Sequence, residues 1–299
     1  MAEAAPVTRS GFVALAGRPN AGKSTLVNAI VGGKVAIVSD RPQTTRRAIR
    51  GVRSTRDWQL VLVDLPGVQR PRDALTERMA RRVERELAES DAVLMVLNGE
   101  QGVGPGDRFI AAALREAGTP VVIAVNKIDR LAHGAVPAVL QQSADLEVGE
   151  DIFPISARTG RGVPELVAHL AALMPVGAFM FDPAELSDQS RETLLAELVR
   201  EAVIRRTFHE LPHAVEVAVE DLDFSREDLA RVRALIWVET DSQKGIVIGA
   251  HGRMIKAIGI AARRELEREL GQHVHLDLSV RVRRHWRADE SLLDRLGIE

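Results

Sequence analysis

The chain has 299 residues, of which 45% are hydrophobic and 27% are charged, and its formal net charge is -2. This composition is that of an ordinary globular protein, which excludes a fibre or a disordered tail, and at roughly 150 residues per domain the length predicts two domains. The sequence contains no cysteine, which excludes disulfides, thiolate metal sites and cysteine nucleophiles and favours the reducing cytosol. Its apolar runs are far shorter than the roughly 20 residues that span a membrane, and it shows no signal segment, so we expect a cytoplasmic protein.

The first part of the chain, residues 1–176, alternates short apolar runs with longer amphipathic stretches. This is the pattern of a βα-repeating parallel sheet that is buried on both faces. Residues 47–54 precede the second run across a short loop and predict an antiparallel edge strand. The sequence therefore predicts a doubly wound α/β domain with a mostly parallel sheet. The predicted strands are 12–16, 60–63, 92–97, 121–125 and 152–155, and the predicted helices are 23–31, 75–88, 107–117, 135–142 and 164–173.

A connector and a second domain follow. Residues 177–190 lack sustained periodicity and belong to a proline-containing stretch, which predicts a linker. Residues 191–299 then show the order α-β-α-β-α-β, which predicts an α+β domain. Its expected elements are a helix from 191 to about 208, a strand at 213–220, a charged helix at 226–233, a strand at 234–240, a helix at 253–270 and a strand at 274–282.

A glycine-rich segment lies between the first predicted strand and the first predicted helix. Its sequence at 17–24 is Gly-Arg-Pro-Asn-Ala-Gly-Lys-Ser, the pattern of a phosphate-binding P-loop in the structural context that makes this match specific. In such a loop backbone N–H groups surround the phosphates, the lysine places its charge beside the β- and γ-phosphates, and the serine hydroxyl binds Mg²⁺. The predicted nucleotide-binding residues of this segment are Gly17, Asn20, Ala21, Gly22, Lys23, Ser24 and Thr25.

Two further segments follow predicted strands. Asp64 and Gly67 belong to an Asp-x-x-Gly segment, in which the aspartate can hold Mg²⁺ and the glycine N–H can meet the γ-phosphate. Asn126, Lys127 and Asp129 form an Asn-Lys-x-Asp segment. Because a carboxylate only accepts hydrogen bonds, Asp129 can take both donors of the Watson–Crick edge of guanine, which adenine lacks. Asn126 would orient the loop and Lys127 would cover the base with its stem, so the sequence predicts a guanine nucleotide.

These segments, with Ser156 and Ala157 after the last predicted strand, resemble in order and spacing the translational GTPase-like class of small GTPases over residues 11–176. A backbone N–H of Ser156 or Ala157 would meet the guanine oxygen. The resemblance implies that a threonine of Pro42-Gln43-Thr44-Thr45-Arg46 closes over Mg²⁺ and the γ-phosphate. Thr45 is preferred and Thr44 is the alternative. The predicted metal ligands are Ser24, Thr45 and Asp64.

One position departs from the pattern of many signalling GTPases. They carry a glutamine after the Asp-x-x-Gly segment to position the attacking water, whereas this chain has Val68, which cannot orient water. In related GTPases a P-loop asparagine helps to hold a K⁺ ion, so Asn20 is a candidate for this role. The alternative is that Asn20 is only a turn residue. The predicted catalytic residues are Asn20, Lys23, Thr45 and Gly67.

The second domain contains a Gly-x-x-Gly loop that opens a predicted helix. Such a loop lets a nucleic-acid backbone pack against main chain, as in KH domains. Between Lys244 and Arg287 the chain has ten Lys/Arg and four Asp/Glu, a local charge of +6 that the whole-chain charge conceals. The aromatic content of 3% disfavours domains that stack RNA bases on aromatic sheets. The predicted RNA-binding residues are Lys244, Gly245, Ile248, Gly249, Ala250, His251, Gly252, Arg253, Lys256 and Arg263.

A GTPase domain followed by a type II KH domain resembles the bacterial Era GTPases, over essentially the whole chain after the first ten residues. The likeness includes three further segments: Glu210-Leu211-Pro212-His213, Gln243-Lys244-Gly245 and the ending from Arg281-Val282-Arg283 to Trp286-Arg287. The resemblance implies GTP/GDP and Mg²⁺ as cofactors, with K⁺ as a further candidate. It implies a ribosome-assembly factor that binds 16S rRNA near its 3′ end on the small (30S) ribosomal subunit, with some peripheral association with the inner membrane. We expect a monomer.

The implied mechanism is a switch. GTP and Mg²⁺ order the Thr44/Thr45 and Gly67 segments, which alters the availability of the KH groove, and hydrolysis resets it. Two other classes of protein are alternatives. A P-loop ATPase or nucleotide kinase is disfavoured by Asp129. A signalling GTPase whose second domain docks a protein would lack salt-dependent RNA binding.

Overall fold

The computed structural model describes residues 7–39, 41, 44–67, 73–132, 134–208, 210–296 and 298. The expectations that concern Pro42, Gln43 and Val68 therefore lie outside the described residues. The chain forms two compact units. The first consists of Met1–Ala36, Thr45–Pro71 and Thr76–Asp188, and the second of Ile37–Thr44, Arg72–Leu75 and Gln189–Glu299.

The first unit is built on a sheet whose described strands follow the order β2-β3-β1-β4-β5-β6. Only β2 runs antiparallel, along β3, and the other pairings are parallel. This confirms the predicted P-loop fold with an antiparallel edge strand. The strand bounds are β1 (Arg9–Ala16), β2 (Ile49–Ser54), β3 (Trp58–Asp64), β4 (Ala92–Asn98), β5 (Val121–Asn126) and β6 (Ile152–Pro154).

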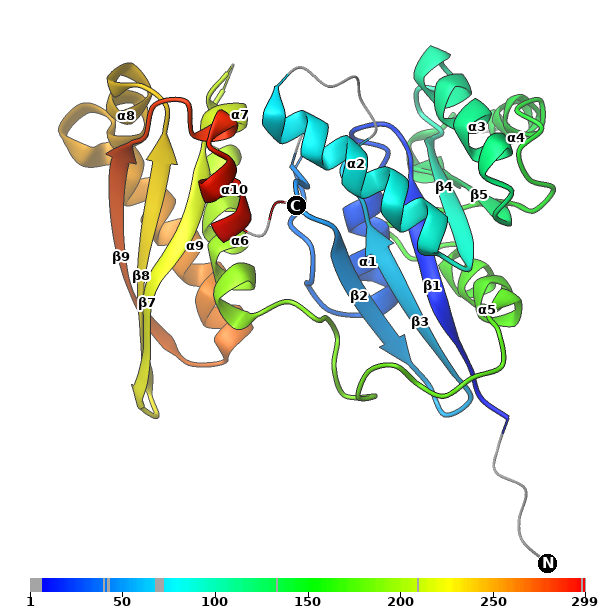
Figure 1. Ribbon diagram of the computed structural model, residues 1–299, viewed down its shortest axis with the longest axis horizontal. Coiled ribbons are helices and arrows are strands. Elements are labelled where there is room, and N and C mark those ends of the chain that lie inside the picture. Colours follow the sequence, from blue (N-terminus) through cyan, green and yellow to red (C-terminus); the bar gives the residue numbers. More distant parts are fainter. Residues whose placement is uncertain are drawn as a thin grey trace, which may run out of the picture. The chain divides into compact units, whose positions relative to one another are not determined.

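Helices cover both faces of this sheet (Figure 1). Along β4, Leu94 and Val96 face the core that contains α1 and α5, whereas Val93 and Met95 face the core that contains α3 and α4. This alternation explains why the strands are apolar at nearly every position: neighbouring side chains point to opposite, equally buried faces. The helix bounds are α1 (Lys23–Val31), α2 (Ala74–Glu89), α3 (Pro105–Ala117), α4 (Val136–Ala144) and α5 (Val163–Leu173).

The segment after α5 is fastened to the first unit by hydrogen bonds. The buried Gln59 side chain accepts from the backbone N–H groups of Met180 and Phe181, at 2.8 and 3.1 Å, and donates to the Phe181 carbonyl at 2.9 Å. The Val52 N–H donates to the Leu186 carbonyl at 2.8 Å. The first unit therefore extends to Asp188, past residue 176 and through most of the predicted linker.

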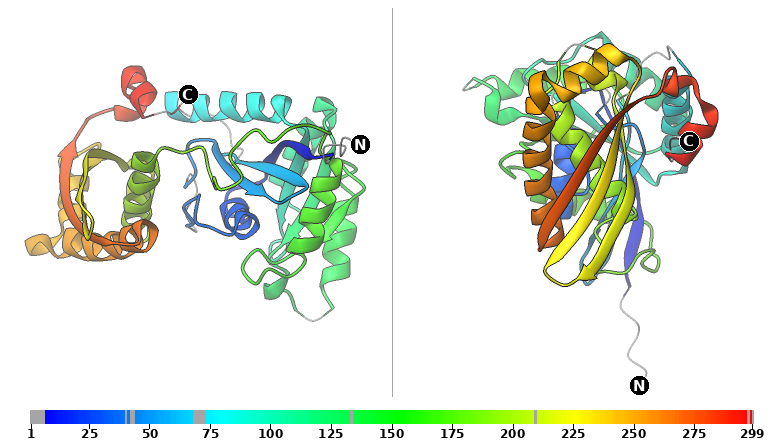
Figure 2. Two further views of the ribbon diagram at one scale, coloured as in Figure 1. Left: turned by 90° about the horizontal axis from the view of Figure 1, so that it is seen from below. Right: turned by 90° about the vertical axis from the view of Figure 1, so that its left-hand side faces the viewer.

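The second unit contains a three-stranded sheet in the order β7-β8-β9. β7 and β8 are antiparallel, and β8 and β9 are parallel. Helices α6 and α9 lie on one face of the sheet (Figure 2). The element bounds are α6 (Arg191–Ile204), α7 (Leu211–Ala214), β7 (Glu216–Arg226), β8 (Leu229–Val238), α8 (Asp241–Ile248), α9 (Arg253–Leu270), β9 (His273–Val282) and α10 (Glu290–Arg295).

The observed order in this unit corrects the predicted α-β-α-β-α-β order. The charged helix predicted at 226–233 is wrong, because these residues form the β7–β8 hairpin and the start of β8. Ala230 and Val232 are buried while Arg231 and Arg233 are exposed, which is the two-residue period of a strand with one solvated face. The order of the main elements is thus α-β-β-α-α-β, with a helix, α8, that the sequence patterns above do not predict.

Helices α8 and α9 flank the Gly-x-x-Gly loop. Thr240 caps α8 by accepting the N–H of Gln243 at 3.2 Å, and the Gln243 side chain accepts the Thr240 N–H in return. Gly249 and Gly252 have φ values of 72° and 74°, in the left-handed region that glycine adopts without steric cost. The loop therefore ends one helix and starts the next within four residues.

The stretch Asp241–Leu270, which contains both helices, is long and apolar enough to cross a membrane by length and composition alone. This is weak evidence, because a core helix of a globular domain meets the same criteria. Here the stretch is broken at the loop, where His251 has non-helical backbone angles. One face of α9 is also buried in the core of the domain, through Ile258, Ala262 and Leu266.

Candidate functional site

The P-loop between β1 and α1 requires glycine at position 22. Gly22 has φ of 99°, and a Cβ there would lie 2.2 Å from Nδ2 of Asn126. The buried Lys23 folds back over the loop and donates to the carbonyls of Gly17 and Arg18, at 3.1 and 3.4 Å. Burial lowers the pKa of Lys23, and the nearby Asp64 charge opposes this shift. The loop thus holds an ammonium group at the start of α1, where phosphates would bind.

Three oxygen-bearing side chains meet beside this lysine. The Ser24 hydroxyl donates to Asp64 Oδ2 at 2.6 Å, and the Thr45 hydroxyl lies 3.1 Å from Ser24 Oγ and 3.3 Å from Asp64 Oδ2. The Thr44 hydroxyl instead donates to the Arg41 carbonyl at 2.6 Å. The structure therefore brings Thr45, and not Thr44, to the other predicted metal ligands.

Asp64 is fully buried, and this burial raises the pKa of its carboxyl, while Lys23 and the hydroxyl donors oppose the shift. Its Oδ1 atom is buried and has no hydrogen-bond partner among the described residues. An unused anionic oxygen beside two hydroxyls is a donor set of hard oxygens, the type that Mg²⁺ prefers. The residues present therefore fit the metal that the fold family implies.

Asn126, at the end of β5, ties three segments together. Its Nδ2 donates to the Ala21 carbonyl at 2.9 Å, and its Oδ1 accepts the N–H groups of Lys127 and Ala157, at 2.8 and 2.9 Å. The side chain therefore links the P-loop to the Asn-Lys-x-Asp and Ser-Ala segments. These contacts fit the predicted role of Asn126 in orienting the loop.

Asp129 lies next to the Ser-Ala segment. Its Oδ1 accepts the Ser156 hydroxyl at 2.6 Å, and its Oδ2 accepts both Nε and Nη2 of Arg158, at 3.1 and 2.7 Å. The Ser156 hydrogen bond, assisted by the Arg158 guanidinium, holds the pKa of this carboxyl below its ordinary value of 3.8. Asp129 is therefore an ionised acceptor at neutral pH, as recognition of the two guanine donors requires.

Two further predicted residues lie near the phosphate loop. A Cβ at Gly67 would lie 2.9 to 3.1 Å from atoms of Pro19, so the Asp-x-x-Gly backbone approaches the P-loop closely. Asn20 has φ of 63°, which asparagine tolerates better than most residues. Both turn geometry and a K⁺-binding role remain consistent with Asn20.

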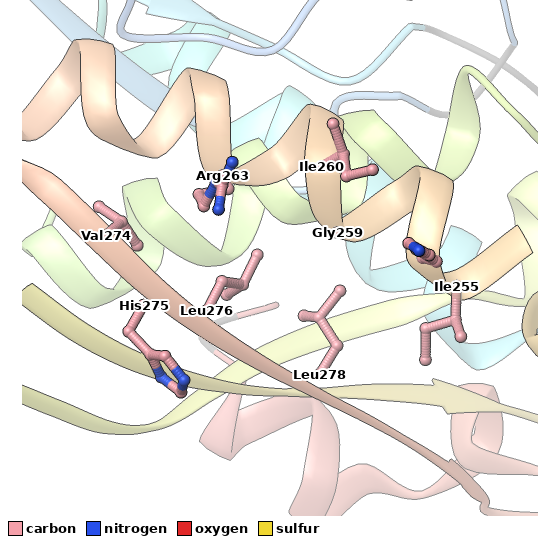
Figure 3. A pocket seen from close by; sticks show the side chains of 9 residues that line it. Ile255, Gly259, Ile260, Arg263, Val274, His275, Leu276 and Leu278 are labelled. Atoms are coloured by element: carbon pink, nitrogen blue, oxygen red, sulfur yellow. The ribbon is translucent and has the colours of Figure 1, made fainter. Parts of the chain in front are cut away.

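The second candidate site is a groove in the second unit. A cavity of about 440 Å³ lies between α9 and β9, with Ile255, Lys256 and Arg263 on the helix side. In Figure 3, Leu276 and Leu278 of β9 lie between the strand and the helix. The groove is thus apolar along its floor and carries two cations on its helical wall, next to the Gly-x-x-Gly loop.

The structure also places four further predicted RNA-binding residues. Ala250, His251 and Arg253 are exposed at the loop and the start of α9. Ile248 is partly buried against the domain core and does not line the cavity. Among the described residues, no group of three or more His, Asp or Glu side chains is placed to hold a metal ion.

Known protein families match the two parts of the chain separately. A family described as 50S ribosome-binding GTPase matches residues 12–127, and the KH domain family matches residues 210–287. The chain is 45% identical to the GTPase Era of Mycobacterium tuberculosis H37Rv over 294 residues, which is 96% of this chain and 98% of the relative. The GTPase Era of Mycobacterium avium strain 104 is 45% identical over 295 residues, 97% of this chain and 98% of the relative.

The chain belongs to the Era family of GTPases. Two solved Era structures are similar to it, each with a TM-score of 0.92 and 31% identity over 97% of this chain and 99% of the other. One is an Era in complex with MgGDPNP and nucleotides 1506–1542 of 16S ribosomal RNA. The other is a variant of Aquifex aeolicus Era bound to GDP and AlF4⁻. The GTPase activity and the KH domain predicted from the sequence are thereby confirmed.

Several residues of this Era-family GTPase that shape the sites were missed by the sequence patterns. Arg18 of the P-loop forms a 2.8 Å ion pair with Asp107, which is fully buried at the start of α3. Arg158 occupies the Asp129 carboxylate. The sequence does contain signals for both residues. Asp107 is the third residue of a proline-initiated helix, a position where an acidic side chain commonly caps the helix N-terminus. Arg158 directly follows Ser156-Ala157.

Proposed function

We propose that this chain is a GTP-driven switch that binds 16S rRNA near its 3′ end and acts in assembly of the small ribosomal subunit. The observation that carries the proposal is the groove between α9 and β9, in which Lys256 and Arg263 line an apolar cavity beside an exposed Gly-x-x-Gly loop. The Era that was crystallised with nucleotides 1506–1542 of 16S rRNA supports the choice of RNA, because the match covers 99% of that chain and 97% of this one.

The nucleotide would bind with its phosphates at the P-loop. The Lys23 ammonium would contact the β- and γ-phosphates, and Ser24, Thr45 and Asp64 would hold Mg²⁺. When bound, Mg²⁺ supplies positive charge that offsets the charge of the phosphate oxygens during transfer. Since Lys23 and Asp64 are both buried, their charges act in a site from which much of the water is excluded, where electrostatic effects are strengthened. The MgGDPNP complex of the related Era supports this choice of cofactors.

Guanine would be recognised by Asp129, whose carboxylate takes the ring N–H and the exocyclic amine. Asn126 would fix the position of this loop relative to Ala21 of the P-loop and Ala157. Binding of fluorescent GDP and ADP tests this assignment. Wild-type protein should prefer GDP strongly, and equal affinities would favour an ATPase or nucleotide kinase instead.

Hydrolysis would depend on Gly67, whose N–H would meet the γ-phosphate, and on Asn20 as a helper of K⁺ binding. A K⁺ ion near the phosphates would supply the positive charge that an arginine finger provides in other GTPases. Turnover of GTP should therefore be faster in KCl than in NaCl at the same ionic strength. Equal rates in the two salts would end the K⁺ proposal and leave Asn20 as a turn residue.

Coupling between GTP and RNA would pass through the predicted switch segments. The second unit includes Ile37–Thr44. Within it, buried Arg200 of α6 donates to the Thr44 carbonyl and pairs with Glu197, and Glu201 accepts the Val38 N–H at 3.2 Å. Thr45, the next residue along the chain, lies at the proposed metal site. A movement of Thr45 when GTP is hydrolysed would thus displace the segment Ile37–Thr44, which is hydrogen-bonded to α6 of the KH domain.

We further propose that the protein works in the cytoplasm as a monomer, with weak peripheral association with the inner membrane. The exposed cations of α9, such as Arg253 and Arg264, would account for such association through anionic headgroups. Flotation with anionic vesicles should then be weak, lost in high salt, and prevented by the rRNA fragment. Flotation that persists in high salt would contradict a purely electrostatic association.

Crosslinking to small ribosomal subunits, with a non-hydrolysable GTP analogue bound, tests the proposed function directly. Crosslinks from the Gly-x-x-Gly loop and α9 should map to the 3′ end of 16S rRNA. Crosslinks from this surface to proteins alone would contradict RNA binding and favour a protein-docking role for the second domain.

A further inference from the structure

The Asp129 carboxylate already accepts three hydrogen bonds from neighbouring side chains. Oδ1 accepts one, from the Ser156 hydroxyl, and Oδ2 accepts two, from Nε and Nη2 of Arg158. An ionised carboxylate offers about four lone-pair positions, two on each oxygen. Oδ2 is therefore filled, and Oδ1 retains one position for an additional donor.

Guanine brings two donors, so it needs one acceptor position on each carboxylate oxygen. Its ring N–H and its exocyclic amine are neighbouring, parallel donors, and a carboxylate meets such a pair with both of its oxygens, as it meets the fork of an arginine. One guanine donor can use the open position of Oδ1. The other requires Oδ2, which the Arg158 guanidinium holds.

We propose that Arg158 is a specificity-determining residue that competes with guanine for the base-binding carboxylate, so that guanine must displace it. The guanidinium offers Oδ2 two N–H donors, so it stands in for the donor that the base would bring. This inference rests on the proposed role of Asp129 in guanine recognition. If so, every guanine nucleotide that binds must compete with the Arg158 side chain for the Asp129 carboxylate.

The local geometry suits a competitor that can leave. The Arg158 side chain is 69% exposed, whereas the Asp129 side chain is only 13% exposed. Asp129 is the only hydrogen-bonding partner of the Arg158 side chain within the described part of the chain. A long, exposed side chain with a single ion pair is weakly held, because water and salt screen the attraction and the pair restricts rotamers. Arg158 can therefore return to Asp129 as the base departs, which would speed nucleotide release.

Comparison of guanine with hypoxanthine distinguishes competition for Asp129 from other effects of Arg158. The base of inosine diphosphate has the ring N–H of guanine but lacks the exocyclic amine, so its single donor can use Oδ1 without displacing Arg158. Removal of the guanidinium should therefore tighten GDP binding and leave IDP binding unchanged. An effect of Arg158 on the ribose, the phosphates or the fold would change the affinities of both nucleotides together.

The test measures binding and release of ribose-labelled fluorescent GDP and IDP by stopped flow. The proteins are wild type, Arg158→Gln, Arg158→Ala and Arg161→Gln, which removes another exposed arginine from the same loop. Because exposed ion pairs are weak, both Arg158 variants should bind GDP about two- to five-fold more tightly, mainly through slower release. IDP affinity should not change, and Arg161→Gln should behave as wild type. The gain should shrink as salt is added, since salt already weakens the pair in the wild type.

Two results would overturn the proposal. Weaker GDP binding by the Arg158 variants would mean that this residue holds the base and does not compete with it. Equal changes for GDP and IDP, or no change for either, would mean that Oδ2 is not contested. If Asp129 does not recognise guanine at all, the result is a different one: wild-type protein would then fail to distinguish GDP from ADP. Urea unfolding of each variant identifies any loss of folded protein.

Discussion

At the scale of single residues, base recognition depends on one carboxylate. Asp129→Asn keeps one acceptor oxygen but gains an amide donor, so it matches xanthine, which has an oxygen where guanine has its amine. Charge-assisted hydrogen bonds contribute about 1.5–3 kcal/mol each, so GDP affinity should fall roughly 10- to 100-fold, while xanthosine diphosphate should bind more tightly. Titration with both fluorescent nucleotides measures this exchange. An unchanged preference for GDP would show that another group selects the base.

The same carboxylate gives a pH dependence with a definite sign. Hydrogen bonding by Ser156 and the Arg158 charge lower the pKa of Asp129 below 3.8 in the folded state. Such a group stabilises the fold at pH values above its unfolded pKa and loses this contribution as the pH falls through its folded pKa. The difference in free energy of unfolding between wild type and Asp129→Asn should therefore be constant from about pH 5 to 8 and shrink below about pH 4. Urea titrations across this range measure it, and a change within the neutral range would be inconsistent with the lowered pKa.

At the scale of elements, the P-loop is tied to α3 by Arg18 and Asp107. Asp107 Oδ2 lies 2.8 Å from Arg18 Nε and accepts the Gly104 N–H at 2.8 Å, and Arg18 Nη2 also donates to the Gly102 carbonyl at 3.2 Å. A Cβ at Gly106 would lie 2.8 Å from Arg18 Cδ, so glycine leaves room for the arginine. The helix start and the phosphate loop therefore share one ion pair.

We expect Asp107→Asn to weaken both the fold and nucleotide binding. The substitution keeps the shape of the side chain but removes the negative charge of a buried carboxylate that pairs with a partly exposed arginine. This loss should lower the free energy of unfolding by about 1–3 kcal/mol. GDP affinity should fall as well, because the P-loop loses its anchor. Glu116→Gln, at an exposed position of the same helix, is the matched control and should change stability by less than about 0.5 kcal/mol. Equal effects of the two substitutions would refute this anchoring role.

The sequence was sufficient for most elements of the first unit and for the convergence of its motifs. Parallel strands buried on both faces give continuous apolar runs, and each motif follows such a run, so Ser24, Asp64 and Asp129 could be predicted from their motifs and from their position after a strand. The β7–β8 hairpin was mispredicted because Arg231 and Arg233 made the start of β8 resemble a charged helix. Only the burial of Ala230 and Val232, which alternate with these arginines, reveals the strand. The Arg18–Asp107 and Asp129–Arg158 pairs join residues distant in sequence. Local patterns single out Asp107 and Arg158, but only the fold shows which residues they pair with.

At the scale of the whole molecule, RNA binding and GTP hydrolysis should be separable. Replacement of Ala250 and His251 by Asp places two negative charges in the exposed loop between α8 and α9, where they would repel phosphates. RNA affinity at low salt should fall roughly tenfold or more, while GTP turnover without RNA stays at the wild-type rate. The control replaces Ala112 and Ala113, which are exposed on α3, by Asp and makes the same change in net charge. Equal loss of RNA affinity in both proteins would point to net charge and not to the loop.

In the proposed function, the nucleotide state governs binding of the 3′ end of 16S rRNA. By linkage, GTP must favour RNA by the same factor by which RNA favours GTP. The most direct test is the dissociation constant of full-length protein for an RNA of nucleotides 1506–1542, measured with Mg²⁺ and either GDPNP or GDP at one salt concentration. Binding should be at least about five-fold tighter with GDPNP, and a scrambled RNA should bind more weakly in both states. Equal constants for the two nucleotides would contradict coupling between GTP and RNA, and equal binding of the scrambled RNA would contradict recognition of the 3′ end.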